Sequence, residues 1–354
     1  MDEQLIKIKD SELHQLIFDK LLRAGLPKEQ AIEVANHLVF ADMSGIHSHG
    51  AVRVDYYAER IDKGGVTRHP NLKFEKTGAS TAIYHGDNAQ GHYVANLALG
   101  PIIEMAKETG VAIVGLSKVS HTGTMSYYLE KLANEDLVAI SICQSDPMVV
   151  PYGGSEVYYG TNPIGFGAPR KNGRPVVFDM ATTVQAWGKI LDARSKGKAI
   201  PETWAVDCHG IPTTDPMAVS GLLPLSGPKG YGLMMMVDML SGVMLGLPFG
   251  KHVSSMYADM TKGRDLGHLF IVIDPSRFIN LEVFKNYVEQ SINELHEVKP
   301  AKGFEQVYYP GEPNILTYQK NKETGINIPK WIIDYLKSDT LHFDKYGDKD
   351  PFAK

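Results

Sequence analysis

One short segment, residues 45–57 (GIHSHGAVRVDYY), gathers side chains suited to binding and deprotonating a small hydroxy acid. If residues 51–62 form a helix, His49, Arg53 and Tyr57 follow at intervals of four and project from one face. Arginine grips a carboxylate through two parallel hydrogen bonds, histidine exchanges a proton near neutral pH, and tyrosine holds an oxygen. The segment therefore predicts a site in which Arg53 binds an acid group beside a hydroxyl that loses its proton.

Two other interpretations of this segment are open from the sequence. Arg53 and Tyr57 also fit a solvated helix face, with His49 satisfying a turn. His47 and His49 stand at alternating positions that can share a metal ion, but a catalytic metal site needs at least a third protein ligand. No HExxH motif, paired CxxC motif or closely spaced carboxylate accompanies them. We therefore predict no metal site.

A second candidate base follows a predicted strand. The apolar run 111–116 leads into residues 120–123 (SHTG). Small polar neighbours after a strand let the imidazole of His121 face a cleft, where it can take a proton. The alternative is a histidine that only satisfies local hydrogen bonds. A cleft formed by both segments would contain a histidine from each, and His49 and His121 fit this arrangement.

The elements that must position these side chains predict a helical start and an α/β body. Apolar residues at helical spacing predict a helical hairpin over residues 10–43, broken at 25–27. From about residue 79 to 183, short apolar strands alternate with helices, and the strands end in small polar residues. One of these helices is expected over 90–107, with an interruption at Gly100-Pro101. In such sheets ligands bind beyond the carboxyl ends of strands.

Composition limits the classes of protein that fit. A chain of 354 residues can bury a large core. Its formal charge of −5 gives no reason to expect binding to nucleic acid or to anionic membranes. Cys143 and Cys208 have no CxxC partners, which fits a reducing compartment. The N-terminus lacks a secretory pattern, and the run 233–249 is too interrupted to span a bilayer; its methionines suit a buried or subunit-facing helix. We expect a cytoplasmic protein that binds a small molecule, with no nucleic-acid or membrane partner.

A hydroxy-acid site without a metal suggests hydride transfer, but the chain has no dinucleotide fingerprint. No GxGxxG motif follows a strand, and the glycines of residues 227–232 (GPKGYG) have the wrong spacing, which argues against a Rossmann domain. Backbone N–H groups at other strand-to-helix turns also hold a pyrophosphate. Residues 179–183 (DMATT) predict such a turn, and Lys229 could reach a phosphate. A helix cap and a solvated lysine are the alternatives.

Together these segments resemble the type 2 malate/L-lactate dehydrogenase family. The resemblance extends from the first helix to Pro351-Phe352, and it is carried by residues 45–57, 120–121, 143–147 (CQSDP), 179–194 and 227–232. It implies a non-Rossmann α/β fold with a mixed sheet, like that of sulfolactate dehydrogenase, and an N-terminal helical segment. It also implies a homodimeric, cytoplasmic, NAD-dependent enzyme that oxidises (S)-ureidoglycolate to oxalurate in allantoin and purine breakdown. Alternatives are a sister enzyme for malate, lactate, sulfolactate or a diketogulonate and, more distantly, a non-catalytic metabolite-binding protein.

The resemblance also implies roles for particular residues. His121 matches a proton acceptor, and His49 matches a proton donor of relatives that act on other oxo acids. Arg53 is then expected to bind the substrate carboxylate, with Ser48 and Tyr57 hydrogen-bonding nearby. The implied cofactor contacts are Ser145, Asp179, Met180, Ala181, Lys229, Gly311, Glu312 and Pro313.

The chain is expected to divide into three parts. Residues 1–75 form a helical segment with part of the substrate site, and residues 76–230 form the α/β cofactor-binding region. Residues 231–354 pack back on the N-terminal lobe.

Overall fold

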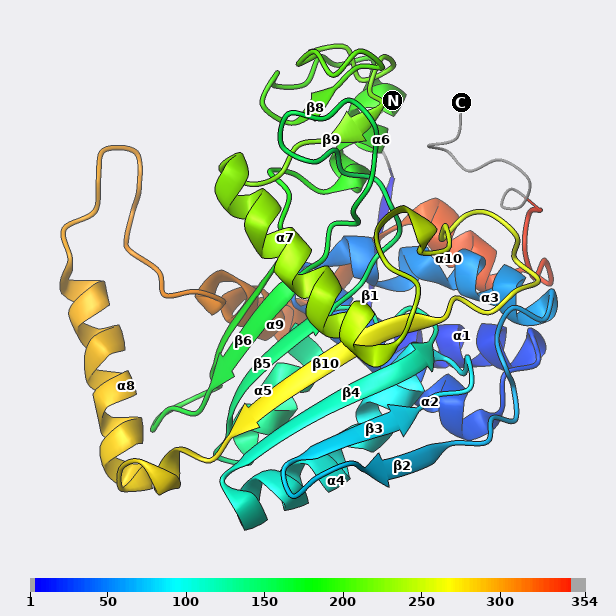
Figure 1. Ribbon diagram of the computed structural model, residues 1–354. Helices are drawn as coiled ribbons and strands as arrows, with labels where there is room; N and C mark the ends of the chain where they lie inside the picture. Colours follow the sequence, from blue (N-terminus) through cyan, green and yellow to red (C-terminus); the bar gives the residue numbers. More distant parts are fainter. Residues whose placement is uncertain (1–3, 345–354) are drawn as a thin grey trace.

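A computed structural model describes residues 4–344, and its body is one seven-stranded sheet (Figure 1). Within this sheet β3 and β4 run parallel, and every other neighbouring pair is antiparallel. The mixed, open sheet confirms the predicted fold class and differs from the parallel sheet of a Rossmann domain. In spatial order the strands are β2 (Lys73–Lys76), β3 (Thr81–His85), β4 (Val111–Val119), β10 (Leu266–Ile273), β5 (Val138–Cys143), β6 (Ile164–Ala168) and β7 (Val176–Met180).

β10 occupies the centre of this sheet although it comes late in the chain. It lies between β4 and β5, with Phe270 opposite Val114 on one side and Ser141 on the other. Its sequence, LGHLFIVI, is buried almost throughout, as expected for a central strand. The ends of β4 and β5, which lead to His121 and Ser145, are therefore held at a fixed separation by a later strand.

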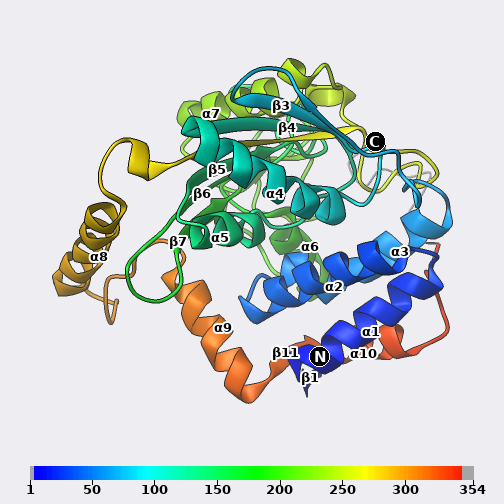
Figure 2. The same ribbon diagram turned by 90° about the horizontal axis from the view of Figure 1, so that it is seen from below.

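Helices cover both faces of the sheet. α4 (Gly91–Thr109) and α5 (Ser126–Asn134) lie on one face and α7 (Pro228–Ser241) on the other (Figure 2). The predicted interruption of the first of these helices is wrong, because α4 continues through Pro101. Ala98, Leu99 and Ile102 are buried against the sheet around that proline, and their packing outweighs one lost hydrogen bond.

The N-terminal helices form a second layer that confirms the predicted hairpin. α1 (Asp10–Arg23) and α2 (Lys28–Met43) are followed by two 3₁₀ turns, η1 (His47–His49) and η2 (Ala51–Arg53), and by α3 (Val54–Asp62). Gly25 adopts φ +91° at the break between α1 and α2, a conformation that favours glycine.

Both ends of the described chain meet in this helical layer. β1 (Leu5–Ile8) pairs antiparallel with β11 (Ile326–Pro329), and α10 (Lys330–Lys337) follows directly. Ile332 and Leu336 of α10 share one hydrophobic core with Leu13 of α1. The division of the chain into three regions, with the limits expected above, stays a prediction.

Two further parts extend from the body. A small unit with its own apolar core contains α6 (Trp187–Lys196), β8 (Ala205–Val206) and β9 (Gly221–Leu222), and it lies at the top of Figure 1. An arm stands off at the left of Figure 1, formed by η5 (Pro275–Arg277), α8 (Leu281–Glu297) and the connection to α9 (Glu312–Thr324). Two more 3₁₀ turns, η3 (Val243–Leu245) and η4 (Gly250–His252), follow α7.

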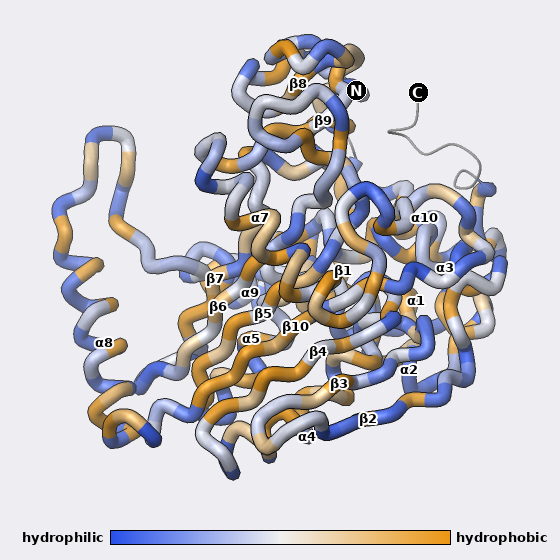
Figure 3. Tube along the Cα trace, viewed as in Figure 1, coloured by the Kyte–Doolittle hydropathy of each residue, from blue (hydrophilic) through white to orange (hydrophobic). Residues whose placement is uncertain are grey.

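Apolar residues concentrate in the sheet, and polar residues dominate the outer loops (Figure 3). Across residues 4–344, no helix combines the length and the apolar character needed to cross a bilayer. The run 233–249 belongs instead to α7 and the turns after it, where Met234 is buried and Met236, Met239 and Met244 are exposed.

Candidate active site

His121 meets Tyr57 and His49, although it lies more than sixty residues after them in the sequence. The hydroxyl of Tyr57, in α3, lies 2.7 Å from Nδ1 of His121, which follows β4. The rings of His49 and His121 are stacked, with centroids 5.7 Å apart. Within the described residues, no hydrogen bond engages Nε2 of His121. That nitrogen is the one that can meet a substrate.

The turn that carries His49 differs from the predicted helix. α3 ends at Asp62 as expected, but it begins at Val54, and Ala51–Arg53 form a 3₁₀ turn in place of its first turn. His49 lies in the preceding turn, η1, and so does not share a helical face with Arg53 and Tyr57. Tyr57 from α3 and His49 from η1 both reach His121.

Asp42 in α2 imposes this turn, and sequence reasoning missed it. Its carboxylate accepts a hydrogen bond from the backbone N–H of Ala51 at 2.7 Å and pairs with Nδ1 of His47 at 2.8 Å. A Cβ atom added to Gly50 would lie 2.2 Å from this carboxylate, so only glycine permits the approach. Asp42 thereby fixes the backbone on both sides of His49.

Arg53 is held beside the two imidazoles by contacts on two sides. Its Nε donates to the carbonyl oxygen of Ser48 at 2.6 Å, and its Nη1 donates to the hydroxyl of Tyr257 at 3.3 Å. The hydroxyl of Ser48 lies 3.0 Å from Nδ1 of His49. The guanidinium is thus oriented at the edge of the histidine pair.

The electrostatics of this cluster keep both histidines uncharged at neutral pH. Burial lowers the pKa of His49 to about 3, and the positive charge of Arg53 adds to the effect. Burial also lowers the pKa of His121 well below its ordinary value, with contributions from His49 and Arg53. Burial raises the pKa of Tyr57, so its hydroxyl keeps its proton. A neutral imidazole is the form that can act as a base.

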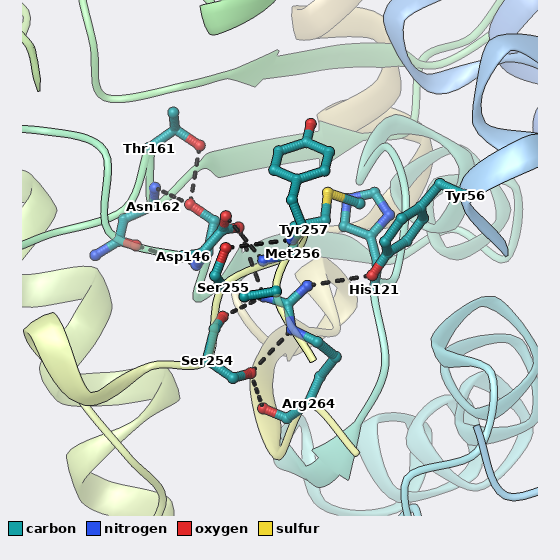
Figure 4. A network of polar contacts seen from close by, with 12 residues as sticks. Tyr56, His121, Asp146, Thr161, Asn162, Ser254, Ser255, Met256, Tyr257 and Arg264 are labelled. Carbon is teal, nitrogen blue, oxygen red and sulfur yellow. Dashed lines mark hydrogen bonds and ion pairs between the residues drawn. The ribbon is translucent and has the colours of Figure 1, made fainter. Parts of the chain in front are cut away.

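A buried ion pair holds the segment that contacts Arg53, and no local sequence signal indicated this pair. Arg264 is only 2% exposed and lies 3.5 Å from a carboxylate oxygen of Asp146. It also donates to the carbonyl oxygen and the hydroxyl of Ser254 at 2.7 and 2.9 Å (Figure 4). Asp146 accepts a backbone N–H from the same segment, residues 254–257, at 3.1 Å. The pair therefore anchors the segment that supplies Tyr257.

A pocket of about 660 Å³ opens beside His49, which is within the usual size of cofactor sites. Ser48 and His49 line it, together with five residues predicted to contact a cofactor: Asp179, Met180, Ala181, Gly311 and Pro313. Thr124 and Ser126, at the start of α5, also face the pocket, and the anionic group at this helix N-terminus is the carboxylate of Asp179.

The remaining predicted cofactor residues lie outside this lining. Ser145 is behind it, with its hydroxyl 3.0 Å from that of Thr161, which does line the pocket. Glu312, at the start of α9, accepts hydrogen bonds from His296 and from a backbone N–H. Lys229 is exposed in the first turn of α7.

The segment after β7 is only partly as predicted. Asp179 ends that strand, where its carboxylate accepts hydrogen bonds from the hydroxyl of Thr124 at 2.7 Å and the backbone N–H of Ser126 at 2.9 Å. Burial raises the pKa of this carboxyl. α6 begins at Trp187 with Ala186 as its N-cap, so the threonines of residues 182–183 do not cap it.

Comparisons of the sequence and of the structure with known proteins all find dehydrogenases. The profile of the family described as malate/L-lactate dehydrogenase matches residues 8–337. A ureidoglycolate dehydrogenase (NAD(+)) of Escherichia coli is 54% identical over 99% of this chain and 100% of its own length. The L-sulfolactate dehydrogenase structure of Methanocaldococcus jannaschii superposes with a TM-score of 0.87 at 36% identity, covering 94% of this chain and 96% of its own. The malate dehydrogenase structure of Entamoeba histolytica has a TM-score of 0.88 at 27% identity, and the match covers 94% of this chain and 97% of that structure.

Proposed function

We propose that this chain, which belongs to the malate/L-lactate dehydrogenase family, oxidises (S)-ureidoglycolate to oxalurate with NAD as the hydride acceptor. The substrate assignment is supported by the 54% identity to the Escherichia coli enzyme over nearly the whole chain, against 38% for a malate dehydrogenase of Pyrococcus abyssi. The structural observation that carries the chemistry is the stacked pair of neutral histidines beside Arg53.

His121 acts as the base in this proposal, and Tyr57 is its positioning residue. If Nδ1–H of His121 donates to the Tyr57 oxygen 2.7 Å away, the lone pair of Nε2 faces the substrate. The hydroxyl proton of the substrate moves to Nε2. The hydrogen on the carbon that bears this hydroxyl leaves as hydride, for which NAD is the acceptor. His49, stacked on His121, orients the substrate oxygen or shares the proton.

The residues around the pocket fit a dinucleotide. Bound NAD would supply the nicotinamide that accepts the hydride. Main-chain groups at the end of β7 suit polar groups of the cofactor, and Ile46, Pro163 and Phe178 offer apolar walls. We assign the cofactor contacts to the predicted set, namely Ser145, Asp179, Met180, Ala181, Lys229, Gly311, Glu312 and Pro313.

Gly311 has a structural reason to be glycine. Its φ of +86° lies in the left-handed region, and an added Cβ would be 2.0 Å from the carbonyl oxygen of Val177. This close approach brings the segment before α9 against β7 at the wall of the pocket.

Arg53 binds the substrate carboxylate in this proposal, and Arg53→Lys tests that role. We expect KM for the hydroxy acid to rise about tenfold or more with a smaller change in kcat, because an ammonium cannot reproduce the two-pronged hydrogen bonding of a guanidinium. Initial rates at saturating NAD measure both constants. Arg277→Lys, on an exposed arginine remote from the pocket, is the control. An unchanged KM would show that Arg53 does not hold the carboxylate.

The lowered pKa of His121 predicts an unusual pH profile. Because burial disfavours the imidazolium, His121 stays unprotonated, and competent as a base, at pH values well below 6.5. We expect kcat/KM to stay level as the pH falls from 8 through 6.5, where an ordinary histidine base loses activity. The profile is measured with re-assay at pH 8 to exclude denaturation. An acid limb centred near the ordinary histidine value would contradict this prediction.

We further propose a cytoplasmic homodimer that works in allantoin and purine breakdown. The exposed methionine face of α7 and the arm support association with a second copy: Tyr287 in α8 is 62% exposed, and Phe278 just before it is 81% exposed. Light scattering on the purified protein measures the mass of the assembly directly.

Neither described cysteine forms a disulfide, which agrees with a reducing compartment such as the cytoplasm.

The assay that tests the function is NADH formation from freshly prepared (S)-ureidoglycolate. A parallel panel with malate, lactate, sulfolactate and diketogulonate, each with NAD and NADP, identifies a sister activity if ureidoglycolate is not the best substrate. No NADH with any member of the panel would favour a non-catalytic binding protein.

A further inference from the structure

The C-terminal end of α3 faces a histidine from the segment after α10, outside the pocket. Glu59, Asp62 and Lys63 belong to the last turn of α3 and the residue after it, and His342 and Asp344 close over them. Glu59 is fully buried, and the side chain of His342 is 13% exposed. None of these side chains takes part in the proposed catalysis.

The hydrogen bonding of His342 leaves one of its nitrogens in an unusual position. Its Nε2 lies 3.2 Å from Oδ2 of Asp62, which can only accept, so Nε2 carries a proton. Nδ1 lies 3.5 Å from Oδ1 of Asp344 and 4.0 Å from Oε2 of Glu59, beyond hydrogen-bonding distance. In the ring form that carries its proton only on Nε2, the lone pair of Nδ1 faces two carboxylates, and a positive ion between them would satisfy all three groups.

Glu59 supplies an independent sign of a missing partner. Its Oε1 accepts a hydrogen bond from Lys63 at 2.8 Å, but its Oε2 is buried and has no hydrogen-bond partner among the described residues. Nδ1 of His342 is buried and unpartnered in the same way. Leaving a buried polar atom unpaired is unfavourable, and here two such atoms face each other.

The charges of the cluster also do not balance within the protein. Lys63 contacts Glu59 and Asp344, but one ammonium faces three carboxylates once Asp62 is included. With a neutral imidazole, a net charge of −2 remains at this spot.

We infer that this cluster binds one divalent transition-metal ion, through Nδ1 of His342, Oε2 of Glu59 and a carboxylate oxygen of Asp344. Two ligand atoms that each lie about 2.1 Å from zinc are about 3.4 Å apart in tetrahedral geometry, close to the separations of 3.5 and 4.0 Å. Asp62 accepts the other ring N–H of His342, which is the usual arrangement behind a metal-bound histidine. An imidazole with two carboxylates suits zinc or cobalt better than magnesium or calcium.

The ion would fasten the C-terminal segment to α3. It neutralises the cluster, and it closes a link between Glu59 and residues more than two hundred positions later. Its role is structural, because the ligands do not line the pocket.

Metal titration of the full-length, tag-free protein tests this inference. After treatment with EDTA and dialysis, we expect isothermal titration with ZnCl₂ to show one site per chain. Cobalt should give visible absorption bands of a low-coordinate ion, and zinc should raise Tm by several degrees over the EDTA-treated protein. These readouts need neither NAD nor substrate, so their failure is separate from any failure of the proposed activity.

Matched variants locate the site. His342→Gln should weaken zinc binding at least about tenfold, and Asp62→Asn should weaken it about 10–100-fold by loosening the histidine. His85→Gln is the control, because His85 faces a single carboxylate, that of Glu75, and should leave binding unchanged. Circular dichroism in EDTA verifies that each variant is folded.

Three outcomes would overturn the inference. They are the absence of a saturable site at one per chain, equal affinity in His342→Gln, or a Tm that follows pH and ignores the metal. The last result would show that a proton on His342, rather than a metal ion, supplies the positive charge.

Discussion

His121→Ala is expected to lower kcat by about 10²–10⁴-fold while leaving NAD affinity near that of the parent protein, because a positioned general base contributes a factor of this size. The reason is geometric: Nε2 of His121 is the nitrogen left for substrate once the hydroxyl of Tyr57 engages Nδ1. Stopped-flow or steady-state NADH formation measures kcat, and NAD titration measures affinity.

His49→Ala and His209→Ala complete this experiment. His209 is exposed in the outer unit, so its replacement should leave kcat unchanged. We expect His49→Ala to reduce kcat less than His121→Ala. A larger loss in the His49 variant would reverse the two roles and make His49 the residue that takes the proton.

Arg264→Met is expected to destabilise the protein by about 3–5 kcal/mol, because removing one member of a buried ion pair leaves the other charge without compensation. Arg264 and Asp146 are 2% and 4% exposed, and the methionine keeps much of the volume of the arginine. Denaturant unfolding at fixed protein concentration measures the change. We also expect KM to rise, since the segment 254–257 carries Tyr257, which contacts Arg53.

Lys107→Met is the control for this substitution. Lys107 is half-exposed and pairs with Glu135 at 2.9 Å, an interaction that water largely screens. Its loss should change the free energy of unfolding by less than about 1 kcal/mol. If Arg264→Met were equally mild, the buried pair would not be what holds the segment 254–257.

Local patterns in the sequence were sufficient to predict much of the fold. Leu13, Ile17 and Leu21 repeat at helical spacing, and the structure buries all three in α1. The apolar run 111–116 was recognised as a strand, now β4, but its pairing with β10 was not, since strand pairing over long separations leaves no local trace. The same limit hid the pairing of β1 with β11.

The sequence predicted the reactive side chains of the site but not the residues that hold them in place. Histidine, arginine and tyrosine in one segment signal chemistry by their types alone. Asp42 and Arg264 are ordinary charges in the sequence, and their roles depend on burial and on partners that only the fold brings near. The prediction of no metal was argued from His47 and His49 and stays a prediction, since a meeting of Glu59 and His342 through tertiary structure leaves no trace in the local sequence.

The pairing of β1 with β11 has a consequence for biosynthesis. β1 leaves the ribosome long before β11, so Leu5 must wait for its partner Pro329 to be made. Until translation reaches α10, the apolar side of α1 lacks the cover that Ile332 and Leu336 later give it. Nascent chains stalled before that point should therefore recruit chaperones, and release of the finished C-terminus should end that dependence.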